Sequence, residues 1–324
     1  MYDFKTIQNI IENAIEKEQW LAEPAALYEP IYYAIQTGGK RLRPALLLMA
    51  ANLFSDDIEP ALLPALGIEI FHNFTLVHDD IMDNAELRRN NLTVHKKWDA
   101  NTAILSGDAM FIKAYQYLLA YEGQQANAVF RLFNQTALEV CEGQQYDMDF
   151  EHSQQVTEQM YLNMIELKTA KLIACSLKMG GLMCGASEYK ADLLYKLGIE
   201  LGNAFQLQDD YLDCFGDPKA FGKQLGGDIL ADKKTYLSIK TYEKGDVKDK
   251  QLLNSLTGSP KIPPEKKVKQ VMDLYKKLGI QKITASKITE YFDQAHNTLK
   301  NIPVHENRKS ALKNLIHSVM ERNK

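Results

Sequence analysis

Apolar side chains recur at intervals of three and four residues along nearly the whole chain. Near the N-terminus this spacing runs through Ile7, Ile10, Ile11, Ala14 and Ile15. It returns later at Leu193, Leu194, Leu197, Leu201 and Phe205. This period is typical of amphipathic helices, and no segment alternates convincingly in the manner of a strand. The pattern therefore predicts an all-α protein.

Turn-forming residues interrupt the helical pattern in six places. These breaks fall at residues 38–39, 55–60, 121–125, 180–187, 215–227 and 257–264. None resembles a long flexible linker. We therefore expect one domain over residues 1–324, packed as a bundle of about ten or more helices.

Composition narrows the range of functions. The 324 residues are 45% hydrophobic, and 38 Lys and Arg against 42 Asp and Glu give a net charge of −4. No overall basic field favours a nucleic-acid partner. No stretch has the length and uncharged apolar character of a membrane span, and the N-terminus lacks a signal-peptide core. The four cysteines show no metal-binding spacing. These features predict a soluble, cytoplasmic protein.

Two copies of one acidic pattern stand out, Asp79-Asp80-Ile81-Met82-Asp83 and Asp209-Asp210-Tyr211-Leu212-Asp213. On a helix, residues i and i+4 lie about 40° apart, so the first and last aspartates of each copy share a face. Clustered carboxylates repel one another unless a cation neutralises them, and Mg²⁺ prefers such oxygen ligands and is usually shared with substrate phosphates. The paired motifs predict a magnesium and diphosphate site.

Cationic segments accompany the acidic motifs. The residues Gly38-Gly39-Lys40-Arg41-Leu42-Arg43-Pro44 place three cations behind two glycines, where a backbone can approach an anion closely. Arg88 and Arg89 follow the first acidic motif, and guanidinium groups bind phosphate oxygens in a bidentate manner.

Together these residues resemble the trans-isoprenyl diphosphate synthases, also called the polyprenyl synthetase family. The segment from Phe71 to Asp83 with Arg88-Arg89 is similar to the first aspartate-rich motif of that family, and Phe205 to Asp213 is similar to the second. Further family marks occur in order at residues 38–44, 105–108, 143–147, 168–169 and 226–233. The resemblance covers roughly residues 35 to 240 and implies helices around a central apolar cavity.

The resemblance also implies roles for individual residues. Asp79, Asp83 and Asp209 would bind Mg²⁺ directly, and Asp80 and Asp213 would lie close by. Three Mg²⁺ ions would surround an allylic diphosphate. The residues implied to hold that diphosphate are Arg88, Lys168, Gln206 and Lys223 or Lys233. Those implied to hold isopentenyl diphosphate are Lys40, Arg43, His72 and Arg89. Gln144, Asp147 and Thr169 would line the allylic site. The catalytic set would be Asp79, Asp83, Asp209, Lys168 and Arg88.

The implied reaction is head-to-tail condensation of isopentenyl diphosphate with an allylic diphosphate. In the family, bulk just before the first motif limits product length, which here concerns Phe71, Phe74 and Thr75. Phe74 beside the small Thr75 favours a geranylgeranyl (C20) product. Phe71 is a further ring that could lower the limit to farnesyl (C15).

Two other functions stay open at this point. A terpene cyclase also ionises an allylic diphosphate, but it does not need the cations assigned to isopentenyl diphosphate. A non-catalytic regulatory subunit is disfavoured because both acidic motifs are intact. The resemblance also implies a homodimer.

Overall fold

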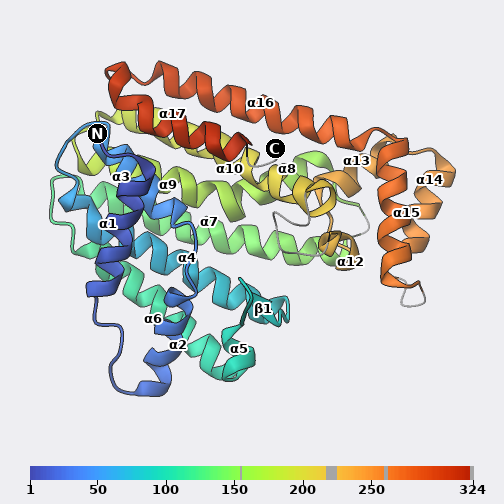
Figure 1. Cartoon of the computed structure of the whole chain (residues 1–324), viewed down its shortest axis with the longest axis horizontal. Coiled ribbons are helices and arrows are strands. Elements are labelled where there is room, and N and C mark those ends of the chain that lie inside the picture. The colour runs from blue at the N-terminus through green and yellow to red at the C-terminus, as the bar shows by residue number, and fades with distance from the viewer. Residues whose placement is uncertain (154, 217–224, 259–261, 322–324) are drawn as a thin grey trace. The chain divides into compact units, whose positions relative to one another are not determined.

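The computed structural model describes residues 1–153, 155–216, 225–258 and 262–321. Their regular secondary structure is helical apart from one short hairpin, which confirms the predicted all-α class (Figure 1). The predicted breaks at residues 38–39 and 121–125 lie between helices, and the one at 55–60 contains only a short 3-10 helix. The break predicted at 180–187 begins too early, because residues 180–183 still belong to a helix. The described residues form two compact units. The expectation of a single domain stays a prediction.

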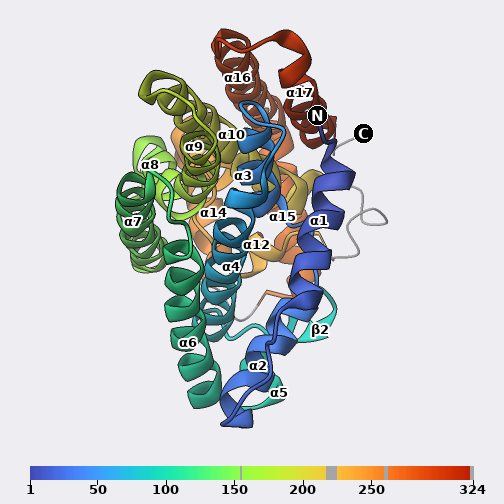
Figure 2. The ribbon, with the colours of Figure 1, turned by 90° about the vertical axis from the view of Figure 1, so that its left-hand side faces the viewer.

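The first unit comprises residues 1–133, 175–194 and 303–312. Its helices are α1 (Phe4–Lys17), α2 (Ala25–Gln36), α3 (Leu42–Asn52), η1 (Glu59–Ala61), α4 (Leu62–Met82), α5 (Val94–Lys97) and α6 (Ala100–Leu119). α4 packs along α6, which Figure 2 shows clearly. Four helices, α7 (Ala126–His152), α9 (Lys171–Met183), α10 (Glu188–Phe215) and α17 (Glu306–Met320), contribute residues to both units.

The second unit comprises the described parts of residues 134–174, 195–302 and 313–324. Besides its parts of the shared helices it contains α8 (Glu158–Ile165), the π-helical turn η2 (Glu166–Ala170), α12 (Gly227–Leu230), α13 (Tyr236–Lys244), α14 (Val247–Leu256), α15 (Pro264–Lys277) and α16 (Ile280–Asn301). α13 and α15 both contact α16.

α4 carries the first acidic motif and is the central helix of its unit. Its only proline, Pro64, lies in the first turn, where a missing N–H costs no helical hydrogen bond. The helix ends at Asp83, and Asn84 then takes a left-handed backbone with a φ of +48°. The window Glu59–Met82 is long and apolar enough to cross a membrane, but 61% of it is buried inside the structure, as in the core helix of a globular protein.

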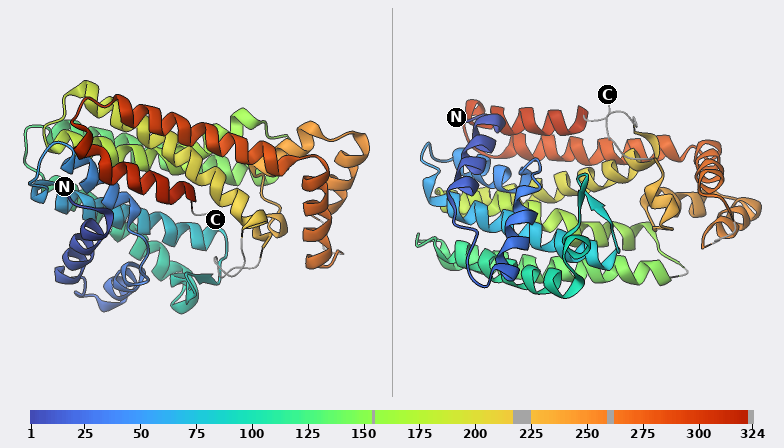
Figure 3. Two further views of the ribbon diagram at one scale, coloured as in Figure 1. Left: turned by 45° about the horizontal axis from the view of Figure 1, so that its top comes forward. Right: turned by 60° about the horizontal axis from the view of Figure 1, so that its bottom comes forward.

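A small antiparallel hairpin follows α4, and the sequence pattern did not predict it. β1 (Leu87–Arg88) pairs with β2 (Asn91–Leu92), and Figure 3 shows it as a short cyan ribbon. Its two turn residues, Arg89 and Asn90, have φ values of +52° and +64°. Two left-handed residues in a two-residue loop form a type I′ turn, which matches the twist of the flanking strands.

Candidate functional site

Two backbone features determine the position of Arg89: the hairpin turn to which it belongs and the glycine against which its side chain lies. Arginine rarely adopts a left-handed backbone, so its position in the hairpin turn carries strain of about 1 kcal/mol. Its guanidinium group lies against Gly39, where an added Cβ would stand only 2.7 Å from Arg89 Nη1. The glycine before the cationic segment therefore makes room for Arg89, which lies on a different element.

Arg43 and His72 form a hydrogen-bonded pair in this unit. Arg43 Nη1 lies 3.0 Å from His72 Nε2, across α3 and α4. Burial and the positive charge of Arg43 hold the pKa of His72 well below its usual value. His72 is therefore neutral at pH 7, and its Nε2 can accept the hydrogen bond that Arg43 donates.

Arg88 is oriented by Asp80. Its Nε and Nη2 both contact Asp80 Oδ1, at 2.8 and 2.7 Å, and Asp80 is only 4% exposed. Burial raises the pKa of Asp80, while the positive charge of Arg88 acts against this. Asp80 thus supports an arginine, whereas Asp79 is half-buried and Asp83 lies exposed at the helix end.

The three cations of the Gly38–Pro44 segment have different environments. Arg41 is 4% exposed and contacts Glu69 at 2.8 Å and Glu12 at 2.9 Å, so it is part of the core. Lys40 is exposed, and Arg43 is half-buried beside His72. Of these three cations, the two that the resemblance implied, Lys40 and Arg43, keep exposed surface, whereas Arg41 does not. We call Lys40, Arg43, His72, Asp80, Arg88 and Arg89 the first half-site.

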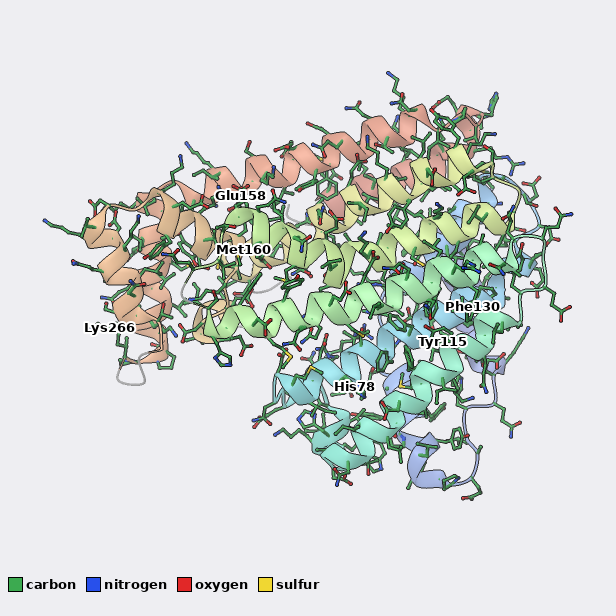
Figure 4. All side chains as sticks on the ribbon, turned by 180° about the vertical axis from the view of Figure 1, so that it is seen from behind. His78, Tyr115, Phe130, Glu158, Met160 and Lys266 are labelled. Atoms are coloured by element: carbon green, nitrogen blue, oxygen red, sulfur yellow. The ribbon has the colours of Figure 1, made fainter. Side chains whose placement is uncertain are left out.

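An aromatic cluster lies one to two turns before Asp79. Phe71 is fully buried, with Phe133 at 5.1 Å between ring centroids. Phe74 is half-buried and lies 5.2 Å from Phe111 and 4.8 Å from His78. Figure 4 labels His78 together with Tyr115 and Phe130, two more rings of this region, 5.6 Å apart.

His78 and Thr75 complete this wall. The Nε2 atom of His78 lies 3.1 Å from the carbonyl of Ile104, so His78 is packed against α6. Thr75 donates its hydroxyl to the carbonyl of His72. Phe74 is therefore the large residue of the predicted chain-length set that keeps exposed surface.

The second acidic motif belongs to a network on α10. Gln206 Nε2 donates to Asp210 Oδ1 at 3.2 Å, and the Tyr161 hydroxyl donates to Asp210 Oδ2. Thr169 donates its hydroxyl to Gln206 Oε1 at 3.0 Å. Asp209 and Asp213 are half-buried on the same helix. Tyr161, on α8, was not found by sequence reasoning because a lone tyrosine in an apolar run carries no motif.

The π-helical turn η2 presents Lys168 and Thr169, and two glycines hold it. An added Cβ at Gly143 of α7 would lie 2.3 Å from Lys168 N, and one at Gly202 of α10 would lie 2.3 Å from Ala170 Cα. Backbones at such distances leave no room for a side chain. Lys168 Nζ then contacts Asp147 at 2.6 Å, one turn beyond Gln144 on α7. Single π-turns of this kind often lie at functional sites.

Asp228 is a further acidic residue of this region. Its backbone N–H donates to Asp213 Oδ2 at 3.0 Å, which joins α12 to the end of α10. This region contains a cavity of about 110 Å³. Its lining includes Asp147, Lys168, Gln206, Asp210, Asp228 and Lys233. Sequence reasoning noted Asp228 only as part of a family mark. We call Asp147, Lys168, Thr169, Gln206, Asp209, Asp210, Asp213, Asp228 and Lys233 the second half-site. Lys223 lies outside the described residues.

The chemistry of the second half-site fits a divalent cation. Burial and the charge of Asp228 raise the pKa of Asp210 to about 8, and burial and the charge of Asp213 raise the pKa of Asp228 to about 6. A bound cation would relieve this crowding of carboxylates. Among the described residues, no three His, Cys, Asp or Glu side chains already form a metal-holding group.

Comparisons with known proteins agree with the resemblance. Residues 24–275 match the family described as polyprenyl synthetase. The chain is 39% identical over 303 residues to a geranylgeranyl diphosphate synthase of Saccharolobus solfataricus, covering 92% of this chain and 91% of the relative. It is 36% identical over 257 residues to a geranylfarnesyl diphosphate synthase of Natronomonas pharaonis, covering 74% and 75%. A crystal structure of a geranylgeranyl pyrophosphate synthase superposes with a TM-score of 0.95 at 42% identity, covering all of both chains.

Proposed function

Because the chain belongs to the polyprenyl synthetase family and is a prenyltransferase, we propose that it makes geranylgeranyl diphosphate by adding isopentenyl diphosphate to allylic diphosphates. The observation that carries this proposal is the match over residues 24–275 with every aspartate of both acidic motifs in place. Relatives named for geranylgeranyl products and the half-buried Phe74 support the C20 length.

In this proposal the first half-site binds the diphosphate of isopentenyl diphosphate through Lys40, Arg43, His72 and Arg89. Arg43 and Arg89 offer planar pairs of N–H donors to phosphate oxygens. Neutral His72 accepts from Arg43 and so fixes the direction of that guanidinium group. Arg88, oriented by Asp80, is assigned to the allylic diphosphate.

Asp79, Asp83 and Asp209 are proposed as Mg²⁺ ligands, with Asp80 and Asp213 in support and three ions in all. Bound Mg²⁺ would stabilise the negative charge of the departing diphosphate. Lys168, Gln206 and Lys233 are proposed to hold the same diphosphate, while Gln144, Asp147 and Thr169 line its site. Lys168 would have to exchange its contact with Asp147 for phosphate oxygens. Apolar walls would keep water from the allylic cation.

A farnesyl product is the second candidate for product length, with Phe71 as the limiting ring. Phe71 is fully buried between other rings, whereas Phe74 keeps exposed surface, and this difference favours Phe74 as the limit. A terpene cyclase is disfavoured by the retained Lys40, Arg43, His72 and Arg89.

We also propose a cytoplasmic homodimer. Leu105, Ile112 and Leu119 form an apolar stripe on the outer face of α6, each about 60% exposed, which a second copy could cover.

The test is to incubate the purified protein with Mg²⁺, labelled isopentenyl diphosphate and dimethylallyl diphosphate, and to size the dephosphorylated alcohols. We expect C20 from the wild type and longer alcohols from Phe74→Ala, with Phe71→Leu as the matched control that keeps C20. A C15 product would assign the limit to Phe71. A C25 product would mean that Phe74 does not limit growth at C20. Hydrocarbon from farnesyl diphosphate alone would indicate a cyclase.

A further inference from the structure

The second unit contains a cavity of about 330 Å³ whose lining shares only Asp228 and Lys233 with the second half-site. It lies among α12, α13, α14 and α15, with Gln155–Thr157 on one side, and we call it the α12–α15 cavity. Figure 1 shows these helices gathered together. Its volume falls at the low end of the range of small-molecule sites, about 300–1,000 Å³, so its occupant would be small.

The floor of the α12–α15 cavity is apolar. Ile229, Leu256, Val271 and Tyr275 line it, each at most 7% exposed, and all four belong to one hydrophobic cluster. Tyr275 adds an aromatic ring that is only 2% exposed. A floor of this kind favours the apolar part of a ligand.

The rim carries lysines. Lys233, Lys234, Lys250 and Lys267 line the cavity with the acidic side chains Asp228, Asp232 and Glu243. Within the lining, Lys267 contacts Asp232 at 2.7 Å, whereas Glu243 contacts Lys240, a cation outside the lining, at 2.7 Å. The lining is therefore cationic on balance, which favours an anionic head group.

The frame of the cavity is built from internal contacts. The side chain of Lys267 is 8% exposed and also donates to the carbonyl of Leu230, and Asp232 accepts from the N–H of Gly258 at 3.0 Å. These bonds connect the turn after α12 with α15 and with the residues that follow α14. The cavity is therefore preformed, which lowers the cost of binding.

We propose that the α12–α15 cavity binds a small anionic amphiphile, with a short apolar chain on the floor and a phosphate or carboxylate at the lysine rim. Asp228, Lys233 and Lys234 line both this cavity and the 110 Å³ cavity of the second half-site. A ligand in the one therefore alters the charges that face a ligand in the other. This coupling rests on the proposed function, whereas the binding itself does not.

The first experiment measures binding by titration calorimetry in EDTA, with decyl phosphate, decanoate and inorganic diphosphate as probes. We expect one decyl phosphate per chain and weaker binding of inorganic diphosphate, which lacks a chain. Leu253→Trp, which fills the cavity, should weaken binding of decyl phosphate tenfold or more. The matched control Leu252→Trp, an exposed neighbour outside the lining, should bind as the wild type does. Equal binding by both variants, or none by the wild type, would overturn the proposal.

A second pair of variants guards against misfolding of Leu253→Trp. Lys250→Met removes a rim charge and should weaken decyl phosphate about fivefold, while Lys248→Met, on the same helix but outside the lining, should not. If decanoate binds as tightly as decyl phosphate, a fatty-acid carboxylate would fit the site as well as an alkyl phosphate. Decyl phosphate binding alone would point to a prenyl or alkyl phosphate.

The coupling is then measured with Mg²⁺ and substrates. Decyl phosphate should raise the KM for the allylic diphosphate at least threefold in the wild type and in Leu252→Trp, but not in Leu253→Trp. Inhibition that persists in Leu253→Trp would show that the probe acts at the catalytic site and would overturn the coupling. A chain that binds the probe but makes no prenyl diphosphate would refute the proposed function and leave the binding proposal intact.

Discussion

At the scale of single residues, Gly39 determines where Arg89 can lie. Gly39 has a φ of +140° and no space for a Cβ beside the Arg89 guanidinium, whereas Gly38, with a φ of +75°, has nothing within 4 Å of such an atom. Both positions penalise a side chain through the backbone, but only Gly39 adds a collision. Gly38→Ala therefore shows the effect of backbone strain without a collision, while Gly39→Ala combines the collision with the stronger strain of a φ of +140°.

We expect Gly39→Ala to raise the KM for isopentenyl diphosphate about tenfold or more, because Arg89 loses its position. The KM for the allylic substrate should change little. Steady-state kinetics with each substrate varied in turn measure both effects, and Gly38→Ala is the control. Equal changes in both alanine variants would show that backbone strain alone is responsible.

Asp210 should make the folded chain less stable as the pH rises, because its buried position favours the protonated carboxyl. Burial and the charge of Asp228 raise the pKa of Asp210 to about 8, while its ordinary value is 3.8. Between these values the folded carboxyl keeps a proton that the unfolded chain has released. The stabilisation is therefore complete below the ordinary value and is lost as the pH rises through the folded value.

Asp210→Asn removes this titration. In EDTA, the free energy of unfolding of the wild type relative to Asp210→Asn should fall between about pH 5 and pH 8, by on the order of 1 kcal/mol per pH unit. Urea unfolding at both pH values measures the difference. The exposed Asp273→Asn serves as the control and should show no such trend. If the difference in unfolding free energy between the wild type and Asp210→Asn does not change with pH, the pKa of Asp210 in the folded chain is close to its ordinary value.

At the scale of elements, η2 depends on two glycine contacts. Gly143 and Gly202 allow α7 and α10 to approach its backbone on either side, so Lys168 and Thr169 are positioned by main chain. An alanine at position 143 must push Lys168 away, because its Cβ would lie 2.3 Å from the Lys168 nitrogen. Overpacking of this kind costs about 1–3 kcal/mol.

Gly143→Ala should therefore lower the melting temperature and reduce kcat/KM for the allylic diphosphate by about a hundredfold or less, with a smaller effect on isopentenyl diphosphate. Calorimetry and kinetics test the two effects separately. Gln145→Ala, an exposed change on the same helix, should alter neither. Loss of stability with unchanged kinetics would show that η2 tolerates the shift and that Lys168 does not depend on it.

The helical class and several breaks between helices could be predicted, but other helix ends, such as those between α1 and α2 or between α16 and α17, and the special turns could not. The three- and four-residue spacing indicated the helices, and clustered turn residues located breaks such as 38–39 and 121–125, because both signals are local. The π-turn η2 has the same apolar spacing as an ordinary helix, and its cause, glycines 143 and 202, is distant in sequence. Likewise, Arg41 and Arg43 look equivalent in sequence. Only packing places Arg41 against Glu69 and leaves Arg43 beside His72.

At the scale of the whole molecule, the outer face of α6 argues for assembly. Leu105, Ile112 and Leu119 repeat every seven residues and are 60%, 59% and 62% exposed, with Asp108 and Gln116 between them. A twofold contact between two copies would bring the same stripe together from both sides. Burial of such side chains contributes about 1.5–3 kcal/mol each, so one charge in the stripe should disrupt the contact.

We therefore expect the wild type to elute as a dimer and Ile112→Lys as a monomer when both are measured by light scattering after size-exclusion chromatography. Val247→Lys is the control, because Val247 is 71% exposed on α14 and lies outside the stripe. Ile112→Lys should keep its helical circular dichroism, since Ile112 makes little contact within its own unit. If Ile112→Lys stays dimeric at the lowest measurable concentration, the α6 stripe is not the interface, and a dimer would have to form through another face.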